Sequence, residues 1–587
     1  MFTSTPVTAA EEGMPYSYEL AATVSGSSAI TFALTTAPAG ATLSGSTITW
    51  TPTHAESRVS NSFTATATTA TGGSATQSWT VTPNGNVNIT AVTTYWTPTG
   101  SINVPPTWQA GILLAVPVVL VPLPDGSFQT LQGAANPDSS FTIPNVPGGF
   151  YWLQLSPRAN YWTSASDFDG GQDVVGDPLS TGPNATTNFD YSISGITSSS
   201  NGDDYFTAQS NVGEFFSPIP AAISPNTTTM TFGISVNANV NWSNVSTLYL
   251  SQFQYTTSGN FTGYLLGPSQ TLTDVSISTG AMNTIDANLS PAAPISIPID
   301  IAGSAWAPIA ALVGPGSPAP TYSAFSVFAQ PYVIDRYAQA MIGSPFGPDF
   351  PMLSTGTVLP PPDTWPFGPS YGCESFISYL TQTSPNTGVS PIVVDTSFGT
   401  LSYDDPYPTN WPRLFQYCQV SSINLPRPNS TATDTFLVST DETTLLPTSP
   451  VAPLLTPVQS PTLNGSSLFQ TATLNTANLQ FSWAPPSVGQ PYAYFLEVYA
   501  LAIPAPGTPG TPIYVEIRNY TTTQTSLSLP LTLPDNTYVF AIVAAADASA
   551  NIKTSPNRHK VPMAHSSVIS APFVISTSAT STTARIK

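Results

Sequence analysis

Carboxylates around a glycine turn are the first residues in this sequence whose types and spacing could do chemistry. Asp167, Asp169 and Asp173 fall at short intervals around Gly170-Gly171, and Asp177 follows them. Oxygen ligands placed around a tight turn are what Ca²⁺ needs in order to collect six or more contacts. The run lacks the glutamate that completes an EF-hand loop, and acidic glycine-rich turns are also ordinary solvated loops. Calcium and plain solvation therefore both remain open for these four aspartates.

A serine between two glycines is the second candidate. Residues 368–372 read GPSYG and fit the GxSxG nucleophile elbow, which requires a strand-to-helix turn and a histidine base. Pro369 precedes the serine, no alternating pattern of strands and helices surrounds it, and the downstream His559 and His565 lie in or beyond another predicted domain. We interpret the match as chance, and His54 as a surface or core residue.

Aromatic residues gather between Trp365 and Tyr417, with Asp395 and two further aspartates among them. Flat aromatic faces beside carboxylates can stack on sugar rings while accepting hydrogen bonds from their hydroxyls. The ligand-binding candidates on this argument are Trp365, Tyr371, Tyr403, Asp404, Asp405 and Trp411. The alternative is that the aromatics are core and loop-packing groups. A glycosidase would need two carboxylates at a fixed separation across a cleft, which a sequence cannot show.

Two cysteines, Cys373 and Cys418, are too few for a disulfide scaffold or a cysteine metal site. A bond between them would stabilise the fold by about 4 kcal/mol on the chain-entropy model, and the sequence leaves bonded and free states open. The sequence holds no HExxH, no paired CxxC, no phosphate-cradling glycine loop and no basic stripe. We therefore expect no cofactor other than calcium, and no enzyme.

Composition favours strands, turns and an exported protein. Only 7% of the 587 residues are charged, against about 25% in an ordinary soluble domain, and there are 61 Pro and 39 Gly. The net charge of −20 repels phosphate backbones and anionic membranes, so no nucleic-acid partner is expected. The longest apolar run, Ile112 to Val121, is too short to span a bilayer. The first residues lack the charged start and apolar core of a signal peptide, so we expect a mature or truncated chain of an extracellular protein.

The stretch from Asp138 to Leu155 shows the β pattern most clearly. Phe141 and Ile143 alternate with polar neighbours, Pro147-Gly148-Gly149 is a strong turn signal, and aromatic residues follow it. This predicts a β-hairpin. Upstream, a Pro-Asp-Gly turn separates two further predicted strands, Ala115 to Leu123 and Ser127 to Leu131.

Residues 1–84 alternate in the manner of a small sandwich, with predicted strands at Tyr16–Leu20, Ile30–Leu34 and Phe63–Thr69. The motifs GMPY (13–16), PAGATL (38–43) and ITWTPT (48–53) resemble the immunoglobulin/cadherin-like domains of bacterial surface proteins. The acidic calcium motifs of cadherins are absent, and we interpret Glu11 and Glu12 as solvated.

Two other segments also resemble known modules. Residues 85–190, with the Pro-Asp-Gly turn and the DSSFTI and VPGGFY motifs, resemble carboxypeptidase-regulatory-like (prealbumin-like) sandwiches, which implies a spacer without activity. Residues 456–575 resemble a fibronectin type III domain, through FSWAPP (481–486), YFLEVY (494–499), LPDNTYVF (533–540) and the closing turn 546–551. That resemblance implies a binding or spacing module with Tyr538 as the corner tyrosine. Residues 576–587 are expected to be a loose tail.

Residues 191–455 resemble no family and are predicted to form one or two large sandwiches. The expected strands are Met230–Val236, Thr247–Gln254, Ile295–Ile301, Tyr322–Ala329 and Pro391–Val394, with one short helix at Pro331–Ile342.

The sequence thus predicts an all-β chain of tandem immunoglobulin-like β-sandwiches with a larger central β block. The expected function is a non-enzymatic structural or adhesion protein, binding other copies of itself or surface glycans. Self-assembly through poorly protected sheet edges would give a surface layer, sheath or filament. The alternative is a secreted carbohydrate-binding or carbohydrate-active enzyme whose middle block is functional. A viral fibre or capsid decoration protein is a third possibility.

Overall fold

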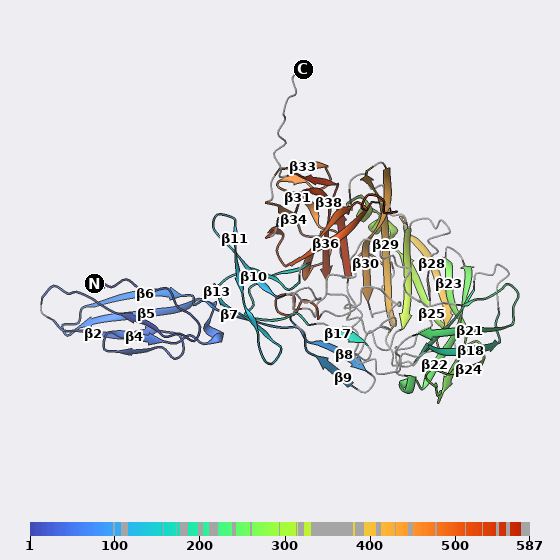
Figure 1. Cartoon of the computed structure of the whole chain (residues 1–587), viewed down its shortest axis with the longest axis horizontal. Helices are drawn as coiled ribbons and strands as arrows, with labels where there is room; N and C mark the ends of the chain where they lie inside the picture. Colours follow the sequence, from blue (N-terminus) through green and yellow to red (C-terminus); the bar gives the residue numbers. More distant parts are fainter. Residues whose placement is uncertain are drawn as a thin grey trace, which may run out of the picture. The chain divides into compact units, whose positions relative to one another are not determined.

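The structure is a computed structural model of the whole chain, and its described part consists mostly of strands (Figure 1). The described residues are 1–26, 28–97, 100–106, 108, 116–156, 158–171, 173–175, 186–197, 204–210, 221–237, 242–258, 261–292, 294–312, 314, 322–329, 380–381, 393–406, 413–428, 430–443, 450–475, 478–510, 512–530, 532–546, 551–558 and 564–576. Within them, 40 strands accompany one α-helix and two short 3₁₀ helices. The all-β prediction is confirmed, as the abundance of Thr and aromatic residues favours.

Contacts divide the chain into two compact units. The first unit comprises Met1–Ala91, Pro106–Gly170 and Lys553–Ser555, and the second comprises Val92–Pro105, Gly171–Ile552 and Pro556–Lys587. The short segment 553–555 joins the first unit through two hydrogen bonds. Thr163 Oγ1 donates to the carbonyl of Lys553, and the amide of Asp169 donates to the carbonyl of Thr554, both over 2.6 Å.

The first unit begins with a small sandwich of two three-stranded sheets. One sheet has the order β1 (Tyr16–Glu19), β4 (Thr47–Trp50), β3 (Thr42–Ser44), and the other β2 (Ile30–Thr36), β5 (Asn61–Thr69), β6 (Ser74–Val81). Their inward-facing aromatic residues form the core, in which the rings of Phe63 and Trp79 stack with centroids 5.3 Å apart. A 3₁₀ helix, η1 (His54–Glu56), links β4 to β5.

A second sandwich completes the first unit. Its first sheet has the order β12 (Ala134–Ala135), β13 (Phe141–Val146), β7 (Gly85–Thr90), β16 (Asp167–Asp169). In the other sheet, β10 (Val118–Pro122) pairs with β11 (Phe128–Gln132) and with β14 (Tyr151–Gln154), which pairs with β15 (Ala159–Thr163). Ile89, Ile143, Leu153 and Phe168 pack between the two sheets. The strands predicted on either side of the Pro-Asp-Gly turn are confirmed as β10 and β11, and the structure pairs them with each other.

The predicted hairpin within Asp138–Leu155 is wrong. β13 pairs with β7 and β12, whereas β14 pairs with β10 and β15, so the chain crosses from one sheet to the other at 147–149. A register shift between Ile143 and Val146, with Asn145 at φ 58°, bends β13 before the crossing. Pro-Gly-Gly signals a reversal but does not specify which strand the chain meets afterwards.

The second unit contains several smaller sheets. The first joins β17 (Asp173–Val175), β8 (Thr93–Thr97) and β9 (Gly100–Val104). Another has the order β21 (Thr229–Asn237), β18 (Thr186–Ser194), β24 (Met282–Asn288). Its core also takes in residues of β19 (Tyr205–Ser210), η2 (Trp242–Asn244) and β22 (Thr247–Ser258), and β19 pairs with β20 (Ala221–Ala222). The strands expected at Met230–Val236 and Thr247–Gln254 are confirmed.

Long strands follow in the same unit. β22 pairs with β23 (Phe261–Thr273), β25 (Pro294–Ile301) with β28 (Thr396–Asp404), and β29 (Arg413–Arg427) with both β26 (Tyr322–Ala329) and β30 (Ser430–Thr443). The two-residue strand β27 (Leu380–Thr381) pairs with β23 and β26. The strands expected at Ile295–Ile301 and Tyr322–Ala329 are confirmed, whereas Val394 precedes β28 and is not in a strand.

The one α-helix of the described residues, α1 (Gly303–Leu312), was not predicted. Asp395 caps its first turn, since Oδ1 accepts hydrogen bonds from the amide and the hydroxyl of Ser304 over 3.1 and 2.6 Å. These bonds hold the pKa of Asp395 below its ordinary value. The helix expected at Pro331–Ile342 lies outside the described residues.

The C-terminal sandwich closes the second unit. One sheet has the order β32 (Ser466–Ser467), β31 (Gln459–Leu463), β34 (Gln480–Ala484), β37 (Ser526–Ser528). Against it stand β33 (Ala472–Leu474), β35 (Ala493–Ala502), β36 (Ile513–Thr522), β38 (Asn536–Ala546), β39 (Ala564–Ile569) and β40 (Phe573–Ile575). The Tyr538 hydroxyl donates to the carbonyl of Pro534 over 2.6 Å, which confirms the predicted tyrosine corner.

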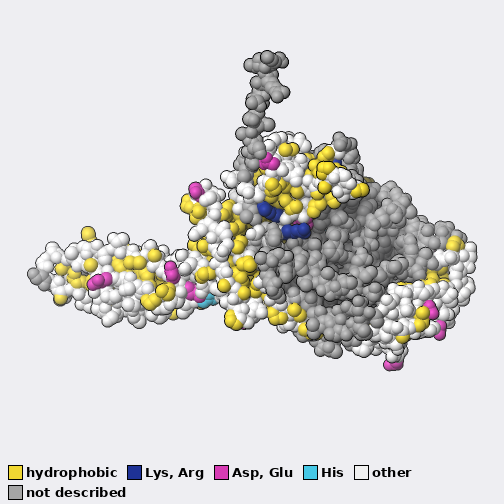
Figure 2. Space-filling model, in the orientation of Figure 1, with side chains coloured by type: hydrophobic (Ala, Val, Ile, Leu, Met, Phe, Trp, Pro, Cys, Tyr) yellow, Lys and Arg dark blue, Asp and Glu magenta, His cyan; other side chains and the backbone are white. Residues whose placement is uncertain are grey.

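Charged side chains are sparse over the described surface of the face seen in Figure 2, where uncharged polar and hydrophobic side chains predominate. This matches a chain with 11 Lys and Arg and 31 Asp and Glu. A search of the described helices finds none with the length and apolar character needed to cross a bilayer.

Candidate functional site at the joint between the first two sandwiches

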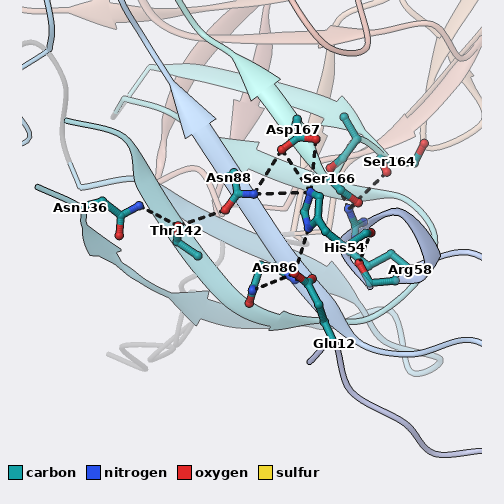
Figure 3. Close-up of polar contacts among 12 residues, drawn as sticks. Glu12, His54, Arg58, Asn86, Asn88, Asn136, Thr142, Ser164, Ser166 and Asp167 are labelled. Atoms are coloured by element: carbon teal, nitrogen blue, oxygen red, sulfur yellow. Dashed lines mark hydrogen bonds and ion pairs between the residues drawn. The ribbon is translucent and has the colours of Figure 1, made fainter. Parts of the chain in front are cut away.

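A network of polar side chains lies where the two sandwiches of the first unit meet (Figure 3). The first sandwich contributes Glu12, from the segment before β1, and His54 and Arg58, from η1 and the loop after it. The second contributes residues of β7 and β16, the crossing at 147–149 and the loop at 164–166. These contacts therefore connect the two sandwiches of the first unit, instead of lying within one of them.

Local sequence explains how η1 presents its side chains. The carboxylate of Glu56 accepts hydrogen bonds from the amide and the hydroxyl of Thr53, which closes the first turn of η1 in the manner of a capping box. The chain then leaves η1 through Arg58, whose backbone adopts a positive φ of 61°. The amide of Arg58 donates to the carbonyl of Pro83 over 2.8 Å, which fixes the loop to the strand entering the second sandwich.

Arg58 is the central side chain of the joint, and only 5% of its surface is exposed. Its guanidinium donates to the carbonyls of Pro147 (3.2 Å), Gly149 (3.0 Å), Ser164 (3.3 Å) and Ala165 (2.7 Å) and to Ser166 Oγ (3.4 Å). A planar guanidinium with five N–H groups suits such a set of acceptors. Arg58 therefore ties the sheet crossing and the loop before β16 to the first sandwich.

Tyr151 forms the floor beneath this guanidinium. The Arg58 guanidinium carbon lies 4.7 Å from the centre of the Tyr151 ring, a cation–π distance, and the Tyr151 hydroxyl donates to the carbonyl of Ala165 over 2.6 Å. Burial lowers the pKa of Arg58 and raises the pKa of Tyr151. An arginine remains charged despite such a shift, since its ordinary pKa exceeds 12, so the joint holds a buried cation whose partners are mainly neutral carbonyls.

His54 forms a second bridge, beside Arg58. Its Nδ1 lies 3.0 Å from Glu12 Oε1, and its Nε2 lies 3.2 Å from both carboxylate oxygens of Asp167. The amide side chain of Asn88 donates to Asp167 Oδ1 over 3.2 Å and lies 3.5 Å from His54 Nε2. Both ring nitrogens of His54 are therefore engaged by carboxylates, one from each sandwich.

Glu12 also contacts the second sandwich directly. Its Oε2 accepts the backbone amide of Asn86 over 2.7 Å, and its Oε1 accepts the Asn86 side chain over 3.2 Å. Partial burial raises the pKa of Glu12, but the hydrogen bond from Asn86 and the contacts with His54 outweigh it and hold the pKa below its ordinary value. The interpretation of Glu12 as solvated is therefore wrong, because strand β7 returns to it, whereas Glu11 is exposed as expected.

Close backbone approach at the joint depends on two glycines. A Cβ on Gly85 would lie 2.2 Å from Ser57 Oγ, and a Cβ on Gly148 would lie 2.4 Å from Thr82 Cγ2 and 3.0 Å from the carbonyl oxygen of Arg58. Any larger residue would therefore clash with Ser57 at position 85 or with Thr82 at position 148, and the local packing of the joint would have to shift.

Three of the four predicted calcium ligands belong to the described part of the chain. The Asp167 carboxylate is bonded to His54 and Asn88, Asp169 lies on β16, Asp173 lies on β17 in the second unit, and Asp177 lies outside the described residues. No group of three or more His, Cys, Asp or Glu side chains in the described part of the chain is placed to hold a metal ion. The calcium prediction stays a prediction, and we assign no metal ligand here.

Only three of the predicted ligand-binding residues, Tyr403, Asp404 and Asp405, belong to the described part of the chain. Asp404 ends β28, and its Oδ2 accepts the amide of Ala292 over 3.0 Å. Partial burial nevertheless keeps the pKa of Asp404 above its ordinary value. Tyr403 lies on β28, Asp405 follows it, and Tyr417 is buried against Trp306 of α1 with ring centroids 4.0 Å apart. Trp365, Tyr371, Trp411, Cys373 and the whole GPSYG motif lie outside the described residues, and Cys418 lies on β29.

Sequence reasoning missed the joint itself. The Thr53-x-x-Glu56 spacing is a capping-box signature that could have placed a short helix at this point. Arg58 is one of only 11 basic residues, so a basic residue directly after such a turn was a signal available in the sequence. Its acceptors lie about 90 to 108 residues away, and no local pattern indicates them.

The comparisons with known proteins support the fold of the first sandwich. Residues 1–84 match the family model described as "Putative Ig domain". A search of curated proteins finds no match. The carboxypeptidase-regulatory-like resemblance stays a prediction.

Solved structures similar to this chain include adhesion proteins. One holds the N-terminal eight Ig domains of the Down syndrome cell adhesion molecule, at 9% identity and a TM-score of 0.13, covering 98% of this chain and 63% of that one. Another is the human desmocollin-1 ectodomain, at 8% identity and a TM-score of 0.15, covering 99% of each chain. A third is a Bacteroides ovatus protein, SGBP-B, solved with a mixed-linkage heptasaccharide, at 11% identity and a TM-score of 0.12, covering 55% of this chain and 76% of that one. At these values none of the three carries an argument about this chain.

Proposed function

We propose that this protein is a modular, extracellular structural or adhesion protein whose first two sandwiches form a stiff arm. The observation that carries the proposal is the buried Arg58, which crosses from one sandwich to carbonyls of the next. A flexible spacer would leave its linker solvated, whereas here a charged side chain is desolvated and fully engaged at the joint. Stiffness between modules is what a projecting or load-bearing surface protein requires.

The rest of the joint supports the same proposal. Glu12, His54 and Asp167 link the sandwiches at a second point, so rotation about a single contact is opposed. The side chains used are polar and short, and neither ring nitrogen of His54 is left over to take a proton from a substrate. The arrangement therefore suits holding two bodies together and does not suit acid–base catalysis.

Stiffness can be tested in the full chain by double electron–electron resonance. Spin labels attached to p-acetylphenylalanine at the exposed positions 71 and 129 report the distance between the two sandwiches without touching the native cysteines. We expect a narrow distance distribution, which Arg58→Met broadens because the guanidinium contacts are lost. Arg158→Met, an exposed arginine of the second sandwich, is the matched control and should leave the distribution unchanged. A broad distribution in the unmodified protein would refute the stiff arm.

The proposal also concerns the binding partners of the second unit. We propose self-association or binding of surface glycans by the second unit, and we propose that the chain acts without enzymatic activity. Light scattering and negative-stain microscopy of the purified chain, with and without calcium, test self-association. Ordered assemblies would support a layer, sheath or filament, and a monomer under all conditions would exclude self-assembly.

A carbohydrate-active function is the second candidate, and one observation favours it. Partial burial raises the pKa of Asp404, and perturbed carboxyls are enriched at catalytic sites. Screening polysaccharides for binding and for reducing-end release separates the two functions. Release that disappears in Asp404→Asn would establish the enzyme over the structural protein.

A further inference from the structure

Strand β2 of the first sandwich forms an edge of its sheet. The strand order is β2, β5, β6, so β2 (Ile30–Thr36) pairs with β5 alone. At the opposite edge the N-terminal segment runs beside β6 and the residues after it. The Gln77 side chain donates to the carbonyl of Ser4, and the amide of Asn84 donates to the carbonyl of Ala10, both over 2.9 Å. Among the described residues, β2 is therefore the edge of this sheet that stays unpaired along its whole length.

The sequence of β2 lacks most of the features that protect such an edge. Natural sheets block an edge with charged side chains, proline, a bulge or a very short strand. β2 has seven residues, ITFALTT, without charge or proline, and its register shift lies near its end, between Leu34 and Thr36. In the other sheet of this sandwich, the edge strands β1 and β3 have only four and three residues, and β1 ends in Glu19. β2 therefore offers a regular stretch, Ile30–Leu34, to an added strand.

The side chains of β2 favour a second strand of the same kind. Phe32 and Leu34 face the core, but at this edge they are only half-buried. Thr31 and Ala33 face solvent on the opposite side of the strand. A strand added beside β2 would bury the first two residues further, which is favourable, and would continue the uncharged outer face.

β2 is also complementary to itself. When two copies of β2 pair antiparallel about a two-fold axis at Phe32, Ile30 lies opposite Leu34, and Phe32 lies opposite Phe32 of the second copy. These pairs share the inward face, where aromatic and aliphatic pairs stabilise antiparallel strands. On the outer face Thr31 lies opposite Ala33, so no charge opposes another.

We infer that two copies of this protein join edge to edge through β2, antiparallel about Phe32, so that two three-stranded sheets become one continuous sheet. The inference rests on the proposed self-association and places one contact on the first sandwich. A two-fold contact closes on itself and gives a dimer. A layer, sheath or filament then requires another contact, which the proposed association of the second unit would supply.

Charges introduced in this register test the inference in the full chain, with sedimentation velocity over a range of concentrations as the measurement. Thr31→Lys combined with Ala33→Lys sets like charges opposite each other twice across the contact, and should weaken dimerisation by about tenfold. Thr31→Lys combined with Ala33→Glu sets opposite charges face to face at the same positions, and should restore the dimer. Thr76→Lys combined with Ser78→Lys adds the same charge at exposed positions of β6, and this matched control should dimerise like the unmodified protein.

The outcomes separate this inference from the proposed function. A protein that sediments as a monomer up to its solubility limit would overturn the inference, while the spin-label distances would still report whether the arm is stiff. Assembly undiminished in the variant with two lysines on β2 would also overturn it, and would leave association through the second unit. Equal weakening in both β2 variants would overturn the register about Phe32. Equal weakening in the β6 control would assign the effect to net charge and not to the edge.

Discussion

The joint of the first unit and strand β35 of the C-terminal sandwich both bury an ionisable side chain, and they treat it in opposite ways. Arg58, 5% exposed, donates to four carbonyls and a hydroxyl. Glu497, 1% exposed, accepts one hydrogen bond, from the Tyr499 hydroxyl over 2.6 Å, and its Oε1 has no hydrogen-bond partner among the described residues. The first site keeps its charge, and the second loses it.

Solvation explains the difference. Burial raises the pKa of Glu497 to about 8, against the hydrogen bond from Tyr499, so the protonated, neutral form of the carboxyl predominates at neutral pH. Arg58 cannot escape in that way, because its ordinary pKa is far above neutrality, and its surroundings must therefore supply acceptors. The buried cation Arg58 is stabilised by backbone carbonyls that connect the two sandwiches. The buried acid Glu497 lacks enough hydrogen-bond donors, and protonation of its carboxyl compensates for them.

The largest expected effect comes from removing the buried cation. Arg58→Met should destabilise the first unit by about 3–5 kcal/mol, since four carbonyls lose donors in a site that water cannot easily enter. Calorimetry of the full chain, following the transition of the first unit, measures this loss. Arg158→Met is the control, and a similar loss in the control would mean that Arg58 is not special.

The second prediction concerns the buried acid and its pH dependence. The folded state holds the proton of Glu497 up to about pH 8, whereas an unfolded chain releases it near 4.5, so stability falls between these values by about 1.4 kcal/mol per pH unit. Buried His565 acts oppositely: burial lowers its pKa from 6.5 to about 3, so its stability contribution rises with pH over that range. The two slopes cancel between 4.5 and 6.5, and a net fall remains between 6.5 and about 8.

Urea-dependent hydrogen exchange of peptides from β35 and β38, corrected for intrinsic exchange rates, measures this profile. Glu497→Gln keeps the size of the side chain and removes the titration, so it should abolish the fall above pH 6.5. Persistence of the fall in this variant would assign it to another group and would break the contrast with Arg58.

A smaller effect is expected from the donor to Glu497. Tyr499→Phe removes the hydroxyl that bonds to Oε2, which should cost about 1–2 kcal/mol and extend the fall in stability to higher pH, because the bond lowers the pKa of Glu497. The same exchange measurement reads both changes. If stability stops falling at the same pH in the variant as in the unmodified protein, the Tyr499 hydroxyl does not influence the pKa of Glu497.

The smallest effect is expected from Thr142, which does not itself connect the two sandwiches but bonds to Asn88 of the joint. Thr142 Oγ1 donates to Asn88 Oδ1 over 3.1 Å and accepts from the Asn136 side chain over 2.9 Å. Thr142→Val should cost about 1 kcal/mol and leave the spin-label distribution of the arm unchanged. Broadening as large as that of Arg58→Met would mean that the network, and not Arg58, sets the stiffness.

Short sequence patterns correctly predicted those strands, turns and hydrogen bonds whose partners lie close together in the sequence. Alternation placed strands at Tyr16–Leu20 and Tyr322–Ala329, and the Pro-Asp-Gly turn paired β10 with β11, because the signal and the partner lie within a few residues of each other. The corner tyrosine, Tyr538, was predictable for the same reason, since its acceptor is four residues away.

Distant partners were not predictable. The Pro147-Gly148-Gly149 turn was read correctly as a turn, but its strands join different sheets, and Glu12 was taken as solvated although β7 covers it. His54 and Arg58 meet groups roughly 90 to 113 residues away. Which of several compatible partners a strand or a cation meets depends on the packing of the whole unit. The predicted ligand-binding residues outside the described part of the chain, such as Trp365 and Trp411, stay predictions.

The short segment 553–555 sets the order in which the first unit can be completed during synthesis. The carbonyls of Lys553 and Thr554 are the acceptors for Thr163 and Asp169, yet Lys553 is synthesised 390 residues after Thr163. At 5–20 residues per second the delay is about 20–80 s, during which β15 and β16 lack these two hydrogen bonds. A nascent chain therefore carries an unfinished arm while its second unit is being made, and truncation before Lys553 would leave that arm permanently unfinished.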